Sequence, residues 1–131
     1  MRQELEKRLV TEFPTFFRDM WGDPRKTCMA WGCSHGDGWY PILYELCQGL
    51  LAESLKDPST DFHFLQIKEK FGRLTLYHSG GNKEMCCLID EAEKKSESIC
   101  EECGVGGVSI DYTLPWYRAL CEGCKIRTNQ P

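Results

Sequence analysis

The sequence has no long hydrophobic run, no low-complexity tract and no internal repeat. No apolar stretch approaches the roughly 18 to 20 residues of a transmembrane helix, and residues 1–8 lack the apolar core of a signal peptide. With 6 prolines and 12 glycines, the composition is neither disordered nor fibrous. These absences argue against a membrane-spanning or exported protein, and we expect a soluble, cytoplasmic one.

Motifs of several common enzyme classes are also missing. The sequence contains no Walker A loop, no G-x-S-x-G, no H-E-x-x-H and no deaminase H-x-E with P-C-x-x-C. Cys33, His35 and Asp37 lie close together along the chain, and an unrecognised enzyme would place them in a deep pocket. Because neighbours on one loop rarely have the geometry of a catalytic triad, we expect no enzyme and no catalytic residue.

The nine cysteines are the most informative part of the composition. The chain has 131 residues, of which 41% are hydrophobic, so it can form one domain with a real core. A chain of this length buries about two-thirds of its unfolded surface and needs no covalent staples. In a reducing compartment such thiols are metal ligands or buried core residues.

Two C-x-x-C motifs lie near the C-terminus, Cys100 with Cys103 and Cys121 with Cys124, separated by 17 residues. This spacing is typical of a four-cysteine zinc site. Four thiolates leave no coordination position open for water, which indicates a structural ion. Gly104 and Gly123 are expected to supply the turns. Free thiols or a redox pair are the alternatives, although a redox pair normally accompanies a βαβ pattern that is absent here.

The other five cysteines are weaker evidence. Cys28, Cys33, His35 and Cys47 could form a second metal site, but Cys47 falls on the apolar face of a predicted helix and free cysteine is often a buried small hydrophobe. Cys86 and Cys87 are adjacent and cannot easily share one ion, so packing explains them better.

Hydrophobic periodicity predicts an α+β fold in which helices pack on a β-hairpin. We expect a single domain, residues 1–131, with helices and hairpin in 1–99 and a zinc-binding subdomain in 100–124. The predicted elements are a helix ending before Pro14, a helix over 39–56, strands over 62–68 and 73–78, a helix from Asn82 to about residue 99, and short strands over 108–112 and 116–120.

A hairpin loop over residues 69–72 would give the two strands one apolar and one polar face. It pairs Ile67 with Leu74, Leu65 with Leu76 and His63 with His78 on the core side. The outer face then carries Phe64 with Tyr77, Gln66 with Thr75, and Lys68 with Arg73. The like charges of the last pair repel each other, which an acidic partner or a neighbouring glutamate could offset.

Charge is unevenly distributed along the chain. The predicted helix after Asn82 aligns Asp90, Glu93, Glu97 and Glu101 in an acidic stripe, and the formal net charge is −4. This balance argues against tight non-specific binding of nucleic acid. The candidate partner-binding residues are Phe64, Lys68, Lys70, Arg73 and Tyr77 on the hairpin and Asp90, Glu93 and Glu97 on the helix.

Three segments resemble a group of small phage and prophage proteins. They are Gly36-Asp37-Gly38-Trp39, the run from Gln66 to Leu74 with Tyr77 and Gly80-Gly81, and Cys100 to Gly104; the first 35 residues fall outside the likeness. The resemblance implies a phage-derived protein acting in a bacterial cytoplasm. We therefore expect a zinc-stabilised protein that binds a host protein, such as a defence component that it blocks. A nucleic-acid-binding zinc module that uses the basic hairpin residues is the alternative.

Overall fold

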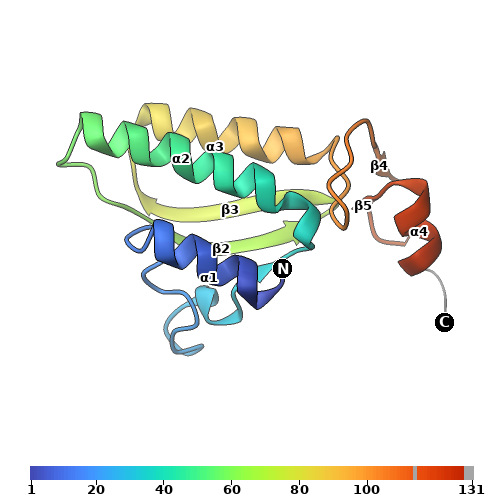
Figure 1. Ribbon diagram of the computed structural model, residues 1–131, viewed down its shortest axis with the longest axis horizontal. Coiled ribbons are helices and arrows are strands. Elements are labelled where there is room, and N and C mark those ends of the chain that lie inside the picture. Colours follow the sequence, from blue (N-terminus) through green and yellow to red (C-terminus); the bar gives the residue numbers. More distant parts are fainter. Residues whose placement is uncertain (114, 129–131) are drawn as a thin grey trace.

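The computed structural model describes residues 1–113 and 115–128 and confirms the predicted α+β architecture (Figure 1). In these residues the α-helices are α1 (Gln3–Glu12), α2 (Tyr40–Lys56), α3 (Lys83–Ser96) and α4 (Glu122–Thr128). The strands are β1 (Cys33–Ser34), β2 (Phe62–Lys70), β3 (Arg73–Gly80), β4 (Ile110–Asp111) and β5 (Arg118–Ala119). Two 3₁₀ helices, η1 (Cys28–Trp31) and η2 (Asp37–Trp39), complete the description.

Local sequence signals explain where the long helices begin and end. α1 ends at Glu12, just before Pro14, as predicted. α2 tolerates Pro41 because that residue lies in the first turn, where its missing N–H leaves no helical bond unmade. The side chain of Asn82 caps α3 by accepting a hydrogen bond from the Met85 backbone N–H at 2.9 Å.

The central sheet has the order β1-β2-β3. β2 and β3 form the antiparallel hairpin, and β1 runs parallel to β2, with Cys33 beside Ile67. The sequence analysis did not predict β1, which is only two residues long. A separate two-stranded sheet, β4 with β5, belongs to the C-terminal subdomain (Figure 1).

The hairpin register differs from the prediction. The turn contains only Phe71 and Gly72, with φ of 55° and 83°, so both adopt the left-handed conformation of a tight hairpin turn. Lys70 therefore pairs with Arg73, and Ile67 pairs with Leu76. The shorter turn moves the register by two residues from the predicted one, and a bulge at Leu65 moves it again and exchanges the faces beyond it. All six predicted pairs are therefore wrong: Ile67 with Leu74, Leu65 with Leu76, His63 with His78, Phe64 with Tyr77, Gln66 with Thr75, and Lys68 with Arg73.

The bulge also sends Phe64 into the core, so the prediction that Phe64 is an exposed partner-binding residue is wrong. Phe64 is fully buried, its ring 5.1 Å from that of Phe17. Leu65, predicted to be in the core, is 40% exposed instead. Phe16 and Phe62 pack edge to face nearby, at 5.4 Å between ring centroids. The segment that follows α1 is thus part of the main core.

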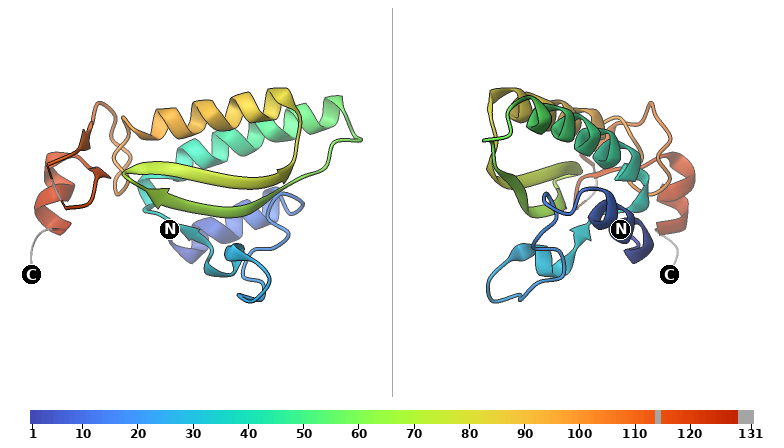
Figure 2. Two further views of the ribbon diagram at one scale, coloured as in Figure 1. Left: turned by 180° about the vertical axis from the view of Figure 1, so that it is seen from behind. Right: turned by 60° about the vertical axis from the view of Figure 1, so that its left-hand side comes forward.

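The main core lies between the helices and one face of the sheet. Ile67, Leu74 and Leu76 point into it, together with the apolar stripes of α2 and α3, which lie side by side (Figures 1 and 2). The opposite sheet face carries Gln66, Lys68, Thr75 and Tyr77, which are half-buried or exposed. None of the helices in 1–113 and 115–128 is long and apolar enough to cross a bilayer.

Candidate metal centre

The four cysteines of the two C-x-x-C motifs converge at the end of the molecule beyond the hairpin turn. The sulfurs of Cys100, Cys103, Cys121 and Cys124 all lie within 4.8 Å of one another. The Cys103 and Cys121 sulfurs are 3.8 Å apart. Four sulfurs at about 2.3 Å from one zinc in a tetrahedron would be separated by about 3.8 Å. The donor set and its spacing therefore fit a divalent ion such as zinc.

Sharp backbone turns place each pair of sulfurs. Gly104 has φ of +84°, and its N–H donates to Cys100 O at 2.9 Å, which closes the first turn. The second pair is placed by the first turn of α4, where the Lys125 N–H donates to Cys121 O at 2.9 Å. Gly123 lies inside this helix and has no positive φ, so the prediction that it supplies a turn is wrong.

Backbone amides favour the thiolate at Cys100, and a guanidinium lies against the sulfur of Cys124. Burial alone raises the pKa of Cys100, but the N–H groups of Cys103, Cys121 and Glu102 outweigh it and lower that pKa to about 6. Burial raises the pKa of Cys124 to about 12, and Arg127, whose Nη2 donates to this sulfur at 2.7 Å, acts against the rise. These donors are positioned to stabilise a negatively charged metal–thiolate centre.

The candidate second site does not form. Within 1–113 and 115–128, the four C-terminal cysteines are the only metal-binding group whose ligand atoms meet. Cys28 is exposed, whereas Cys33, Cys47 and His35 are buried. Burial raises the pKa of the Cys33 and Cys47 thiols and lowers the pKa of His35 to about 4, so all three are neutral near pH 7.

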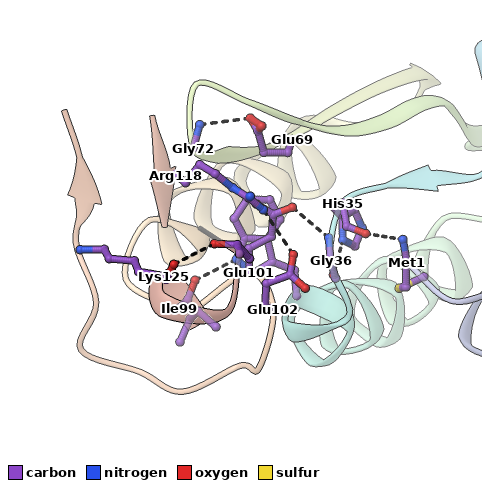
Figure 3. A network of polar contacts seen from close by, with 12 residues as sticks. Met1, His35, Gly36, Glu69, Gly72, Ile99, Glu101, Glu102, Arg118 and Lys125 are labelled. Carbon is purple, nitrogen blue, oxygen red and sulfur yellow. Dashed lines mark hydrogen bonds and ion pairs between the residues drawn. The ribbon is translucent and has the colours of Figure 1, made fainter. Parts of the chain in front are cut away.

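Glu101 joins the metal centre to the rest of the protein. This residue, predicted to belong to an exposed acidic stripe, follows the end of α3 and is only 4% exposed, so that prediction is wrong. Its Oε2 accepts the Gly36 N–H at 2.9 Å (Figure 3). Its backbone oxygen accepts the Gly38 N–H at 2.7 Å. Arg118 Nη2 lies 3.6 Å from Oε1, and burial raises the Glu101 pKa.

Two further contacts fix the subdomain in place. The Trp39 indole Nε1 donates to Ile99 O at 2.9 Å. At the hairpin turn, Gly72 packs so closely that an added Cβ would lie 3.1 to 3.2 Å from Ile110 Cγ2, Arg118 N and Tyr117 C. The four-cysteine subdomain is therefore seated on both the Gly36–Gly38 loop and the hairpin turn.

An exposed group of rings surrounds this second contact, and we call it the aromatic surface: Phe71, Tyr112, Trp116 and Tyr117. Phe71 and Trp116 are 69% and 72% exposed. Tyr112 and Tyr117 pack edge to face, with ring centroids 4.9 Å apart. The sequence analysis missed this surface, although three aromatic residues between two C-x-x-C motifs are a visible signal that the loop does more than hold an ion.

The predicted partner-binding residues fall into different settings. Lys70 and Tyr77 are exposed on the hairpin, and Lys68 is half-buried on the same face. Arg73 Nε lies 3.9 Å from Glu97 Oε1, so these two residues form an ion pair. Asp90 is exposed on α3.

Glu93 has a structural role that the prediction did not foresee. Its Oε2 accepts the Leu76 N–H at 2.9 Å, and the buried Ser96 Oγ accepts the Leu74 N–H at the same distance. α3 thereby satisfies the outer edge of β3, which would otherwise present unpaired amides. The predicted stripe of free carboxylates is thus broken up by contacts within the protein.

No family model, no curated protein and no solved structure matches this chain.

Proposed function

We propose that this is a zinc-stabilised binding protein whose contact surface for another protein is the aromatic surface. The exposure of four large rings at one end of the molecule carries this proposal. Contiguous exposed apolar groups are uncommon on monomeric proteins unless they bind something, and Trp, Tyr and Phe are enriched at protein interfaces. The rings gain binding energy only when a partner covers them.

In this proposal zinc has a structural role. Three of the four rings, Tyr112, Trp116 and Tyr117, lie between the two C-x-x-C motifs. The small core beneath this loop consists of Cys100, Leu120 and Cys124, so most of its buried side chains are sulfur ligands. Four thiolate ligands complete a tetrahedral shell, and the ion therefore orders the loop instead of reacting with a substrate.

A host protein is the partner class that we favour. The likeness of the Gln66–Leu74 and Cys100–Gly104 segments to phage and prophage proteins supports this choice. A phage protein of this size acts most simply by covering a surface of a host component, such as one used in defence. Inhibition by binding needs no catalytic group on this chain.

Nucleic-acid binding is the second candidate, favoured by the lysines beside the rings. Lys68 and Lys70 lie at the end of β2, directly before the turn that carries Phe71. Aromatic rings that can stack on bases, with lysines nearby, are typical of proteins that bind single-stranded nucleic acid. Two observations weaken it. Phe64 is buried and cannot stack on a base, and Arg73 is paired with Glu97.

Affinity capture with a matched tryptophan control tests the proposal. Zinc-loaded chain, the Trp116→Ser variant and the Trp31→Ser variant are each used to capture proteins from bacterial lysate at moderate salt, with identification by mass spectrometry. Trp31 is as exposed as Trp116, at 71% against 72%, but lies on η1. We expect a partner that the wild type and Trp31→Ser retain and Trp116→Ser loses. Equal recovery by all three, or no specific partner, would contradict the proposal.

A further inference from the structure

We propose that the aromatic surface recognises an acidic segment of its protein partner. The apolar side chains of that segment pack among the rings, and its carboxylates lie beside Lys68 and Lys70. This inference rests on the proposed function and adds the chemistry of the partner.

A cleft at the hairpin turn can hold the apolar side chains of such a segment. A space of about 390 Å³ is lined by Glu69, Lys70, Phe71, Pro115, Trp116 and Tyr117. Its walls come from two segments far apart in the sequence, the turn between β2 and β3 and the loop before β5. The rings and Pro115 give this cleft an apolar wall, with Glu69 and Lys70 at its hairpin side, and such a wall accepts one or two aliphatic or aromatic side chains of a peptide.

The carboxylates of the four-cysteine subdomain are already paired with cations. The acidic residues of the subdomain have cationic neighbours. Arg118 Nη2 lies 3.2 Å from Glu102 Oε1 and 3.6 Å from Glu101 Oε1. Lys125 Nζ lies within 3.5 Å of both Asp111 and Glu122. These four carboxylates are therefore not free to attract a cationic partner. Glu69, the carboxylate that lines the cleft, accepts the Gly72 N–H at 3.2 Å through Oε2 and is not ion-paired within the described residues.

The lysines beside the rings have no such neighbour. Within 1–113 and 115–128, neither Lys68 nor Lys70 has a carboxylate oxygen within 4.0 Å. Lys70 Nζ lies 5.8 Å from the centre of the Phe71 ring and directly opposes Arg73 across the strands. Arg73 is already paired with Glu97, so Lys70 is the cation of this pair that lacks a carboxylate, and one brought by a partner would be favourable here.

The same charges favour a peptide over a nucleic acid. Tight nucleic-acid binding neutralises several phosphates in a row, commonly about six to ten. Here two lysines are available, Glu69 lies between them in the sequence, and a zinc–tetrathiolate centre in the neighbouring subdomain would carry a formal charge of about −2. A peptide can place one or two carboxylates at the lysines and neutral side chains elsewhere. A phosphate chain cannot avoid the acidic side in this way.

An unbiased peptide selection tests the inference. A random library of dodecamer peptides is selected on the zinc-loaded full chain, and affinities of enriched peptides are measured by fluorescence polarisation. The same peptides are tested on Trp116→Ser, on Lys68→Glu with Lys70→Glu, and on a control with Lys7→Glu and Lys26→Glu. Lys7 and Lys26 are exposed and distant from the cleft in sequence. A twelve-residue oligothymidine serves as a competitor, and zinc content shows that each variant is folded.

The expected result is enrichment of Asp and Glu next to Leu, Phe or Trp. Affinity should fall about tenfold or more in the Lys68/Lys70 variant and in Trp116→Ser, remain unchanged in the Lys7/Lys26 control, and resist oligothymidine. Enrichment of Lys and Arg, no enrichment, or displacement by oligothymidine would overturn the inference. Peptides lost with Trp116→Ser but indifferent to the lysine reversal would overturn this inference alone, whereas peptides indifferent to Trp116→Ser would contradict the proposed function as well.

Discussion

Removing the metal should loosen the four-cysteine subdomain and leave the hairpin folded. The perturbation is either chelation or Cys121→Ser, with Cys87→Ser as the control because Cys87 is an exposed thiol outside the site. In the small core of Cys100, Leu120 and Cys124, two of the three buried side chains are sulfur ligands, so without an ion little holds it together. The main core is built from other residues and should stay folded. We expect about one zinc per chain in the wild type and in Cys87→Ser.

The magnitude follows from binding linkage. At a free zinc concentration about 1,000 times the dissociation constant, the ion stabilises the folded subdomain by about 4 kcal/mol, a roughly 1,000-fold change in local opening. Hydrogen exchange by mass spectrometry should show a change of that order at the amides of Cys100, Glu101, Gly104 and Lys125, which are hydrogen-bonded within the subdomain. The Gly38 amide should follow, because it donates to Glu101 O. Unchanged exchange over 100–128 in metal-free protein would refute the reasoning.

Three other predictions concern residues of the main core and of its contact with the four-cysteine subdomain. Burial lowers the His35 pKa from 6.5 to about 4, so between these pH values the unfolded state binds more protons than the folded state. The free energy of unfolding should therefore fall by about 3 kcal/mol as the pH drops through that window. In urea titrations at pH 7 and 4.5, His35→Asn should lack this pH-dependent loss. Ser96→Ala leaves the Leu74 N–H unpaired in a buried position and should cost about 1 to 3 kcal/mol of unfolding free energy, with the exposed Ser98→Ala near zero. Gly38→Ala should weaken zinc retention during dialysis against a chelator, because its Cβ would lie 2.6 Å from Gly104 N and Glu101 O, whereas Gly123→Ala meets nothing within 4 Å and should retain zinc as the wild type does.

Signals that are local in the sequence predicted three of the four α-helices of the described residues and the four cysteines that converge, whereas α4 was not predicted. Pro14 stops a helix, and Asn82 caps one, whatever lies elsewhere in the chain. The spacing of two C-x-x-C motifs is likewise a local pattern that favours one arrangement of four sulfurs. These features depend on neighbours a few residues away, which is why a single sequence reveals them.

The features that the prediction missed depend on contacts distant in the sequence. The bulge at Leu65 is stable because it buries Phe64 against Phe17, and nothing within β2 itself announces that preference. Phe71 has a positive φ in the hairpin turn, a position where Asn or Gly is the usual signal. Glu101 is buried because Gly36, 65 residues earlier, offers its N–H to the carboxylate. Composition alone places such a glutamate on the surface.

In the proposed function, the position of the four cysteines makes zinc binding and partner recognition interdependent. Phe71 is held by the hairpin, but Tyr112, Trp116 and Tyr117 are held by the loop between the two pairs of sulfurs. Gly72 allows that loop to approach the turn, so the rings from the two segments line one cleft only when the subdomain is folded. If the cleft binds a partner as proposed, an ion that favours the folded loop must strengthen that binding. By thermodynamic reciprocity, a partner seated in the cleft must strengthen zinc binding by the same factor.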